Sequence, residues 1–141
     1  MLGIDTSLRS SGYGVVESVG TRLVEVTHGI IAQTKPEAAA IEGIFFCKNA
    51  RTALVLGQAR GVALLACTAA GLPVFEHEPR RVKQAIVGHG AAEKHQVAQM
   101  VARLLGLAAI PEQEDATDAL AIAICQIQAR TGYAALDAEA L

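Results

Sequence analysis

Residues 2–19, LGIDTSLRSSGYGVVESV, decide the fold at the start of the chain. Leu2–Thr6 is short and apolar and predicts a buried strand, and Gly12–Val19 predicts a second one. Leu23–Ala32 has the same strand-like pattern, and Gly20-Thr21 supplies the turn of a hairpin before it. The chain therefore opens with three strands, of which the last two form a hairpin.

The rest of the sequence alternates between helical and strand-like segments. A weaker fourth strand is predicted over Ala38–Gly43, because alanine prefers helices, and a short fifth strand over Pro73–Phe75. Helices are predicted over Asn49–Ala70, Pro79–Val87, Ala91–Leu105 and Asp115–Ala129. This order indicates a single domain over residues 1–141, built as an α/β layer with an antiparallel part at its start.

The composition indicates a folded protein of a reducing compartment. Apolar residues make up 52% of the 141 residues and charged residues 18%, which excludes a disordered chain. No apolar run reaches the roughly 18 residues of a membrane helix, and no secretion signal is expected. Cys47, Cys67 and Cys125 are odd in number and widely spaced, which argues against a disulfide framework. We therefore expect a cytoplasmic protein.

The charges are unevenly distributed, although the net charge is only −2. The part from Lys48 to Arg103 has an excess of five positive charges, and the rest of the chain has an excess of seven negative charges. A basic middle part can bind a polyanion such as DNA while the acidic residues hold a metal ion. Ordinary solvated surface charge explains the same distribution equally well.

Four acidic residues stand where a ligand site of such a sheet is expected. Asp5 lies at the C-terminal end of the first predicted strand and Glu42 at the matching end of the fourth, and neighbouring parallel strands would place these ends about 4.8 Å apart. Ligand sites of α/β sheets lie beyond the carboxyl ends of the strands. Asp115 and Asp118, three residues apart at the start of the last helix, share one helix face. The alternative role of this last pair is a favourable interaction with the helix dipole.

A divalent cation is the expected partner of these four acids. Four converging carboxylates repel one another unless a cation lies between them. Oxygen donors without soft ligands favour Mg²⁺, with Mn²⁺ as the alternative. The histidines are interpreted as structural or surface residues, and none is assigned to a metal: His28, His77, His89 and His95.

Four pieces of the sequence allow comparison with known families: GIDTSLRSSGYGVV, AIEGIFFCKNARTALVLGQARGVAL, PVFEHEPRRVKQAIVGHGAAEKHQVAQMV and DATDALAIAI. In this order they resemble the RuvC-type Holliday-junction resolvases. The resemblance extends over nearly the whole chain, and the second and third pieces are long and specific. The family often has Asp-Pro-Gly where this chain has Asp5-Thr6-Ser7, so the turn after the aspartate can differ. Some relatives carry histidine at the Asp115 position.

The resemblance implies an RNase H-like fold, a five-stranded mixed sheet in the order 3-2-1-4-5 flanked by helices. It implies a metal-dependent endonuclease that acts as a homodimer and resolves four-way DNA junctions by paired symmetric incision in recombination and repair. Asp5, Glu42, Asp115 and Asp118 are then the catalytic, metal-binding acids. Two metal ions about 3.5–4 Å apart supply an activated water and stabilise the leaving oxygen, which gives 5′-phosphate ends. A branch-migration complex of the RuvA/RuvB type is a candidate partner.

The resemblance also implies contacts with DNA. We assign Phe45 to stacking or wedging between bases at the junction centre and Phe46 to the interior. Lys83 and Lys94 match basic residues that contact DNA and phosphate in the family, and the alternative is that they are solvated lysines on helices. The expected DNA-binding set is Phe45, Lys48, Arg51, Arg81, Lys83 and Lys94.

The long predicted helix carries a repeat of mostly small residues. Ala53, Gly57, Gly61 and Leu65 recur every four residues, and small side chains on one face allow another helix to approach closely. Packing against the protein's own sheet is the alternative. The resemblance favours a dimer interface, in which this helix meets its symmetry mate across a two-fold axis.

Other functional classes remain open. The first piece also resembles the first phosphate loop of actin-like ATP-binding domains, but 141 residues cannot supply the second lobe. Another RNase H-like nuclease is a further alternative. A non-catalytic junction-binding protein would not need all four acids.

The connection before the fourth strand is short for the implied fold. The chain must pass from near Ala32 to near Ala38 across three strand spacings, about 14 Å, and return along a strand of roughly 17 Å. Gln33–Glu37, fully extended, reach about 16–18 Å, and the family has a helix here. We therefore predict that the natural protein carries an additional helix, with a break in the present sequence between about Thr34 and Glu37.

Overall fold

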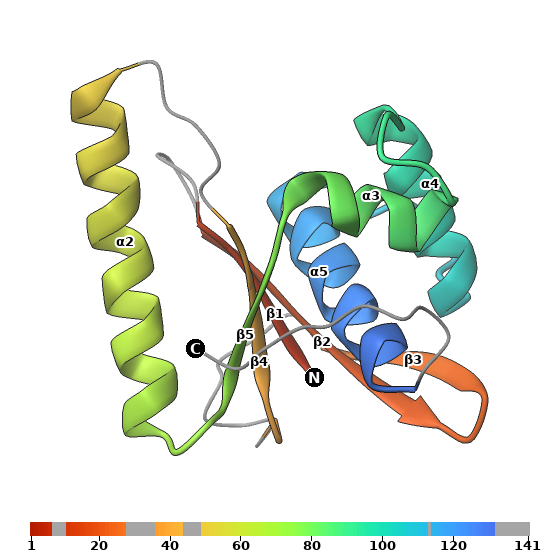
Figure 1. The fold of residues 1–141 in the computed structure, drawn as a ribbon. Helices are drawn as coiled ribbons and strands as arrows, with labels where there is room; N and C mark the ends of the chain where they lie inside the picture. Colours follow the sequence, from red (N-terminus) through yellow and green to blue (C-terminus); the bar gives the residue numbers. More distant parts are fainter. Residues whose placement is uncertain (7–10, 28–35, 44–48, 113, 132–141) are drawn as a thin grey trace.

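Five strands form one mixed sheet in the computed structural model, which describes residues 1–6, 11–27, 36–43, 49–112 and 114–131 (Figure 1). The strands are β1 (Leu2–Thr6), β2 (Ser11–Val19), β3 (Arg22–Thr27), β4 (Ala39–Glu42) and β5 (Val74–His77). They lie in the order β3-β2-β1-β4-β5. β2 is antiparallel to both of its neighbours, whereas β4 is parallel to β1 and to β5. This confirms the predicted mixed sheet and its order.

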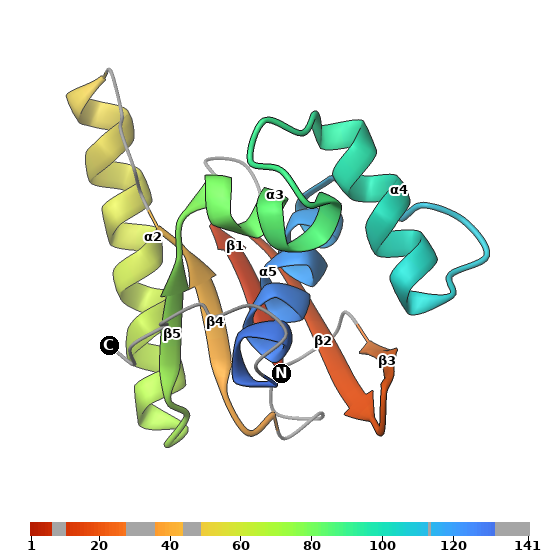
Figure 2. The ribbon, with the colours of Figure 1, turned by 45° about the vertical axis from the view of Figure 1, so that its right-hand side comes forward.

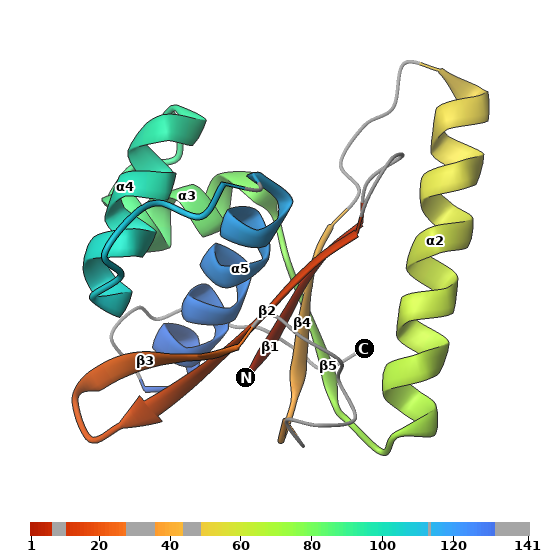
Figure 3. The same cartoon turned by 180° about the vertical axis from the view of Figure 1, so that it is seen from behind.

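Helices cover both faces of the sheet. The described helices are α2 (Ala50–Ala69), α3 (Pro79–Val87), α4 (Lys94–Leu105) and α5 (Glu114–Arg130). α2 lies alone on one face, and α3, α4 and α5 lie on the other face, as Figure 1 and the view from behind in Figure 3 show.

Local sequence signals set the first turns of the helices. Asn49 caps α2, and its side-chain oxygen accepts hydrogen bonds from two backbone N–H groups of the first turn. α4 begins at Lys94 rather than at the predicted Ala91. The backbone N–H of Glu93 donates to Gln96 Oε1 at 2.9 Å, and this contact fixes the start of the helix.

Two strand ends differ from the predicted ones. β5 continues to His77, two residues beyond the predicted Phe75, because Glu76 and His77 still pair with β4. Residue preferences alone do not show such pairing. β3 ends at Thr27, and residues 28–32 of the predicted third strand lie outside the described residues.

α5 is the central helix of the fold. Every residue from Ala119 to Ile127 is buried, and a helix that is buried on all sides is typical of a core element. It crosses β1 and β2 closely because both strands have glycine there: a Cβ on Gly3 would overlap the carbonyl oxygen of Ala119, and one on Gly14 would lie 2.7 Å from a side-chain carbon of Leu120. Figure 2 shows α5 across the sheet with α3 and α4 outside it. Each fully buried Leu or Ile in this layer contributes about 1.5–3 kcal/mol.

α2 packs on the other face of the sheet through a narrow contact. Cys67 is buried there, and Ala63 and Leu64 are partly buried against the apolar side chains of β1, β4 and β5. The opposite side of α2 exposes Leu54 and Leu65, with 64% and 70% of their surface accessible. Cys67 is thus the one fully buried residue of α2, while several of its large apolar side chains face the solvent.

The described cysteines are free thiols in apolar surroundings. Cys67 and Cys125 are both buried, and Cys47 lies outside the described residues. Burial raises the pKa of the Cys125 thiol to about 11 and raises the pKa of Cys67 as well. Both thiols are therefore protonated at neutral pH and poor nucleophiles.

Candidate active site

The carboxyl ends of β1 and β4 lie side by side at one end of the sheet. Ile4 pairs with Ile41 in parallel register, so Asp5 and Glu42 follow directly after this pair. Ala40 packs on the face covered by α5, and side chains two residues apart in a strand share a face. The half-buried Glu42 therefore lies on the α5 side of the sheet. The side chain of Asp5 lies outside the described part of the structure.

α5 brings two more acids to this end of the sheet. Asp115 and Asp118 lie near its N-terminus and are both half-buried. Ala119 crosses over Gly3, and the C-terminal part of α5 lines a cavity together with Met1, at the start of β1. α5 thus runs opposite to β1, and its first turn lies toward the carboxyl end of that strand (Figure 1). The positions of all four predicted acids therefore share one end of the fold.

Lys94 brings a positive charge to these acids. Its Nζ lies 3.2 Å from Asp118 Oδ2 and 3.8 Å from Glu114 Oε2. The Lys94 side chain is 69% exposed, and exposed ion pairs contribute only about 0–1 kcal/mol to stability. The contact therefore adds little to stability, but it places an ammonium group beside Asp118 at the edge of the acidic group.

A cavity of about 210 Å³ opens beside Asp118, between the starts of α4 and α5. Lys94, His95, Ile110 and Thr117 contribute to its walls. The Thr117 hydroxyl is buried and has no hydrogen-bond partner within the described ranges. Asp118 is therefore accessible from the side of the site that faces α4.

The donor set fits a hard divalent cation. Glu42, Asp115 and Asp118 supply only carboxylate oxygens, and Asp118 already attracts the ammonium group of Lys94. No group of three His, Cys, Asp or Glu side chains forms a metal site among the described side chains, which do not include that of Asp5. Two observations support a metal at this site: the ligands are all carboxylate oxygens, and the four acids lie at the same end of the sheet.

The structure describes only some of the predicted DNA-binding residues. Phe45, Phe46 and Lys48 lie outside the described residues. Arg51, in the first turn of α2, and Lys94, at the start of α4, are exposed. Their contacts with DNA stay predictions.

α3 carries the other two basic residues of this set. Lys83 is half-buried. Arg81 is also half-buried and lines a cavity of about 670 Å³ between the β2–β3 hairpin, α3 and α5, together with Leu23 and Ile127. Its guanidinium is therefore partly withdrawn from the surface that DNA would meet, and its predicted contact has less structural support than that of Lys94.

The sequence analysis missed a contact between α2 and the end of β4. Arg60 Nη1 donates to the carbonyl oxygen of Glu42 at 2.6 Å, and Nη2 pairs with the carboxylate of Glu76 on β5. In the sequence, Arg60 is one of the eight basic residues from Lys48 to Arg103 and has no motif of its own. Arg60 precedes the buried Cys67 by seven residues, two helical turns, so both lie on the side of α2 that faces the sheet, but the sequence does not indicate which groups Arg60 meets there.

The predicted interface residues of α2 differ in exposure. Gly57, Gly61 and Leu65 are exposed, and a Cβ on either glycine would meet no described atom within 4 Å. The alternative role of these glycines, close packing on the sheet, therefore has no support in the described part of the chain. Ala53 is half-buried, and its neighbour Leu54 is more exposed.

By length and composition, α2 is the one described helix that could cross a membrane. The apolar runs within α2 are short, because scattered glycine, threonine, glutamine and arginine residues interrupt them. A single helix of this kind is weak support for a membrane span, since core helices of water-soluble proteins have the same composition.

His77 is buried next to the strand end that carries Glu42. The two residues are register partners in the β4–β5 pair. His77 Nε2 lies 2.6 Å from Gln126 Oε1 and donates to it, because an amide oxygen can only accept. Nδ1 is buried with no partner in the described structure. Burial lowers the pKa of His77, the hydrogen bond that His77 donates to Gln126 opposes this effect, and the positive charge of Arg81 lowers the pKa further.

The lowered pKa of His77 predicts a loss of stability in mild acid. The native state disfavours protonation of His77, whereas the unfolded chain takes up a proton near the ordinary pKa of about 6.5. The contribution of neutral His77 to the free energy of unfolding is therefore complete above pH 6.5 and decreases as the pH falls below it, by at most about 1.4 kcal/mol per pH unit. Urea unfolding at several pH values should show this slope, and His77→Gln should reduce it.

The exposed His89 provides the matched control for this measurement. His89→Gln should leave the pH dependence unchanged, because His89 is exposed on the surface. An equal slope in the wild type and in His77→Gln would show that other groups cause the acid sensitivity.

Comparison with known proteins identifies the family. The sequence model of the crossover junction endodeoxyribonuclease RuvC family matches residues 25–126. The RuvC protein of Chloroflexus aggregans is 46% identical over 147 aligned positions, covering 88% of this chain and 90% of the relative. RuvC of Citrifermentans bemidjiense is also 46% identical, over 148 positions.

Solved structures agree with this result. The structure of T. thermophilus RuvC in complex with Holliday junction substrate is similar with a TM-score of 0.89 and 33% identity, covering 99% of this chain and 98% of that chain. A second structure, of Thermus thermophilus RuvC, has a TM-score of 0.83 over the full length of both chains. The fold is RNase H-like, and the chain belongs to the RuvC family of crossover junction endodeoxyribonucleases.

Proposed function

We propose that this protein cuts four-way DNA junctions by metal-dependent hydrolysis, in recombination and repair. The observation that carries the proposal is the position of the four acids at one end of a sheet whose fold and sequence are those of a junction endonuclease family. A similar protein is known in complex with a Holliday junction.

Each acid has a role in this proposal. The metal is held by the four carboxylates of Asp5, Glu42, Asp115 and Asp118. Each site holds two ions, and Mg²⁺ is preferred over Mn²⁺. When bound, the ions supply Lewis acidity to the attacking water and to the leaving oxygen. Lys94 binds the phosphate at the edge of the site, since its ammonium already lies beside Asp118. The expected products carry 5′-phosphate ends.

The direct test is cleavage of a synthetic four-way junction. We expect Mg²⁺-dependent incision of two opposed strands, no incision in EDTA, and no comparable cutting of a linear duplex of the same sequence. A nucleotide-binding measurement on the same sample tests the actin-like alternative. Junction binding without cleavage at any Mg²⁺ concentration would favour the non-catalytic alternative instead.

DNA contacts extend from the acids across the same end of the molecule. In this proposal Phe45 stacks on bases at the junction centre, and Lys48, Arg51 and Lys83 contact the backbone. The exposed position of Arg51 at the start of α2 supports this arrangement. The half-buried Arg81 is the weakest member of the set.

A second copy of the chain is the proposed partner of α2. Its exposed stripe contains Leu54, Gly57, Gly61 and Leu65, which recur at three- and four-residue spacing on one face. Exposed apolar surface of this kind is costly in water. Two opposed incisions also need two active sites, which a two-fold dimer supplies. A RuvA/RuvB-type complex remains a further candidate partner, and the cytoplasm is the proposed location.

Gly61→Leu is predicted to yield monomers. The branched side chain adds bulk at the centre of the stripe and forces facing helices apart. Sedimentation should show the monomer mass, and any remaining cleavage should nick one strand. Ala66→Leu is the control: Ala66 is exposed on the same helix but five residues along, about 140° around the axis. If Gly61→Leu dimerised with wild-type affinity, this face of α2 would not be the dimer interface.

The natural protein is proposed to be longer than the present sequence by one segment before β4. The alignment with the Chloroflexus aggregans relative has 147 positions but uses only 88% of 141 residues, about 124, so about 23 positions have no counterpart in this chain. β3 ends at Thr27, so residues 28–38 connect it to β4, and an extended chain of this length is long enough to span the distance. Residues 28–35 lie outside the described part of the chain, so the break between about Thr34 and Glu37 stays a prediction.

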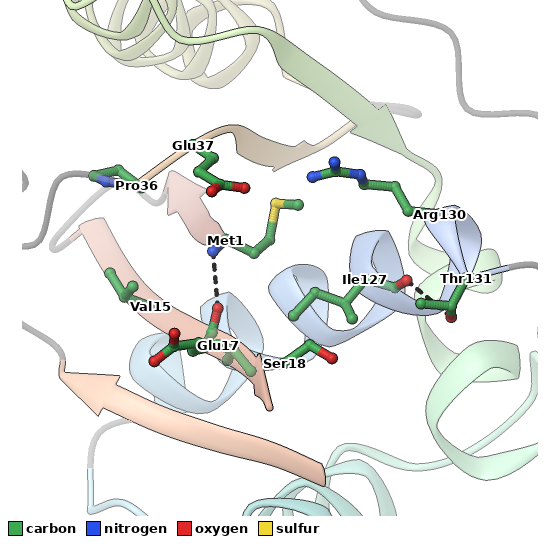
Figure 4. Close-up of a pocket in the computed structure, with 10 residues that line it drawn as sticks. Met1, Val15, Glu17, Ser18, Pro36, Glu37, Ile127, Arg130 and Thr131 are labelled. Carbon is green, nitrogen blue, oxygen red and sulfur yellow. Dashed lines mark hydrogen bonds between the residues drawn. The ribbon is translucent and has the colours of Figure 1, made fainter. Parts of the chain in front are cut away.

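The position of this segment is compatible with the proposed active site. Pro36 and Glu37, which would follow it, line a cavity of about 540 Å³ with Met1, Glu17 and Arg130 (Figure 4). This cavity lies at the start of β1 and β4, at the opposite end of the sheet from the acids. Sequencing the reading frame between the codons for Thr27 and Ala39 should reveal about 20 additional codons. A continuous frame matching the present sequence would refute the proposal.

A further inference from the structure

Arg60 joins three elements at the edge of the proposed active site. Its side chain leaves α2, donates to the carbonyl oxygen of Glu42 at the end of β4, and pairs with Glu76 on β5. The Arg60 side chain is only 13% exposed, whereas that of Glu76 is 39% exposed. The guanidinium is thus held inside the structure by two acceptors of different strands.

Gly43 shapes the same contact. A Cβ at this position would lie 2.7 Å from Glu76 Oε1, so glycine leaves space for the carboxylate beside the strand end. The N–H of Gly43 donates to the carbonyl oxygen of His77 at 2.9 Å. The peptide group between Glu42 and Gly43 is therefore fixed from both sides, by β5 through its N–H and by α2 through its C=O.

A purely stabilising ion pair is the simpler explanation, but it accounts for only half of the geometry. The pair with the partly exposed Glu76 is weakened by solvent. Arg60 gives its other donor to a neutral backbone oxygen, and that oxygen belongs to the residue that carries an active-site carboxylate. A planar guanidinium with two fixed donors determines orientation more strictly than a flexible ammonium group does.

We propose that Arg60 is a positioning residue for Glu42. It fixes the backbone at the end of β4, and Glu76 in turn orients the guanidinium, so that the Glu42 carboxylate is held ready for the metal. This inference rests on the proposed function, in which Glu42 is a metal ligand. It also makes α2 part of the support of the active site in its own chain.

The test compares metal binding with cleavage in four variants. Arg60→Met keeps the stem and removes both contacts, Arg60→Lys keeps the charge, and Glu76→Gln weakens the pair. Arg103→Met, at an exposed position in the last turn of α4, is the matched control. Electron paramagnetic resonance of the free ion measures Mn²⁺ binding. Junction binding is measured in EDTA, and cleavage is measured as a function of Mg²⁺ concentration.

Arg60→Met should weaken Mn²⁺ binding about tenfold and raise the Mg²⁺ concentration for half-maximal cleavage equally, as with other groups that orient a metal ligand. Cleavage at saturating Mg²⁺ and junction binding in EDTA should stay near wild type. Arg60→Lys and Glu76→Gln should show smaller losses of the same kind, and Arg103→Met none. A merely structural role would lower the unfolding midpoint without moving the metal dependence.

Unchanged Mn²⁺ affinity in the folded variants would overturn the inference. Should Arg60→Met fail to fold, the milder Arg60→Lys and Glu76→Gln decide the question by the same measurements. Failure of the proposed function gives a different result: the wild-type protein itself would then neither bind Mn²⁺ nor cut the junction.

Discussion

Asp5→Asn is expected to slow junction cleavage about a thousandfold or more, because a metal-binding charge that contributes several kcal/mol to transition-state stabilisation is lost. The substitution keeps the shape of the side chain, so folding and junction binding in EDTA should remain close to wild type. Cleavage of a labelled junction under single-turnover conditions, together with a mobility-shift assay, measures both quantities.

Glu17→Gln is the control for this prediction. Glu17 is an exposed acid on β2, away from the proposed site, and its substitution also removes one negative charge. It should therefore leave cleavage unchanged. Near-normal Mg²⁺-dependent cleavage by Asp5→Asn would remove Asp5 from the metal site and with it the proposed arrangement of ligands.

Gly3→Ala is expected to cause the largest loss of stability, at least about 3 kcal/mol, at the upper end of overpacking effects. The added Cβ would overlap the carbonyl oxygen of Ala119 and lie within 3 Å of the backbone nitrogen of Ala123. Backbone atoms of a buried helix cannot move aside as a flexible side chain can. Thermal unfolding followed by circular dichroism should show a midpoint lower by roughly 10 °C.

Gly57→Ala makes the same chemical change on a helix surface that is open within the single chain, on the face proposed to meet a second copy, so the comparison is made on the monomer. A Cβ on Gly57 meets no described atom within 4 Å, and alanine is about 1 kcal/mol more favourable than glycine inside a helix. This variant should be as stable as the wild type or more stable. A Gly3→Ala protein with an unchanged unfolding midpoint would mean that α5 lies farther from β1 than the structure places it.

The sheet and its order could be predicted because the relevant signals are local or belong to long motifs. Leu2–Thr6 and Ala38–Gly43 are short apolar segments with an acid as the next-to-last residue, and the structure places them side by side as β1 and β4. Gly3 and Gly14 are small because a helix crosses them. That crossing depends on tertiary packing, and no local pattern of the two strands indicates it.

The contacts made by long charged side chains could not be predicted. Arg60 and Glu76 are 16 residues apart and belong to a helix and a strand, so only the packing of α2 on the sheet brings them together. The same holds for Lys94 and Asp118, 24 residues apart. The spacing of residues in the sequence shows which side chains lie on the same face of a helix or strand. It does not show how close two helices or strands lie to each other, and these ion pairs depend on that distance.

The interface face of α2 shows a further limit of spacing arguments. The four-residue repeat selected Ala53, but an α-helix has 3.6 residues per turn, so a strict repeat of four drifts around the axis. Ala53 is half-buried, and Leu54 carries the exposed apolar surface instead. The repeat correctly found exposed glycines at positions 57 and 61.

The contrast between α5 and α2 has a consequence for amide hydrogen exchange. The amides of residues 119–127 lie in a continuously buried helix, so they should exchange only when the whole domain unfolds. α2, with its narrow contact to the sheet, should open locally and exchange much earlier in a single chain. Asp115 and Asp118 precede this segment at the start of the same helix, whereas the surface proposed to meet a second copy lies on the helix that opens first. Association of two chains can therefore slow the opening of α2 without disturbing Asp115 and Asp118.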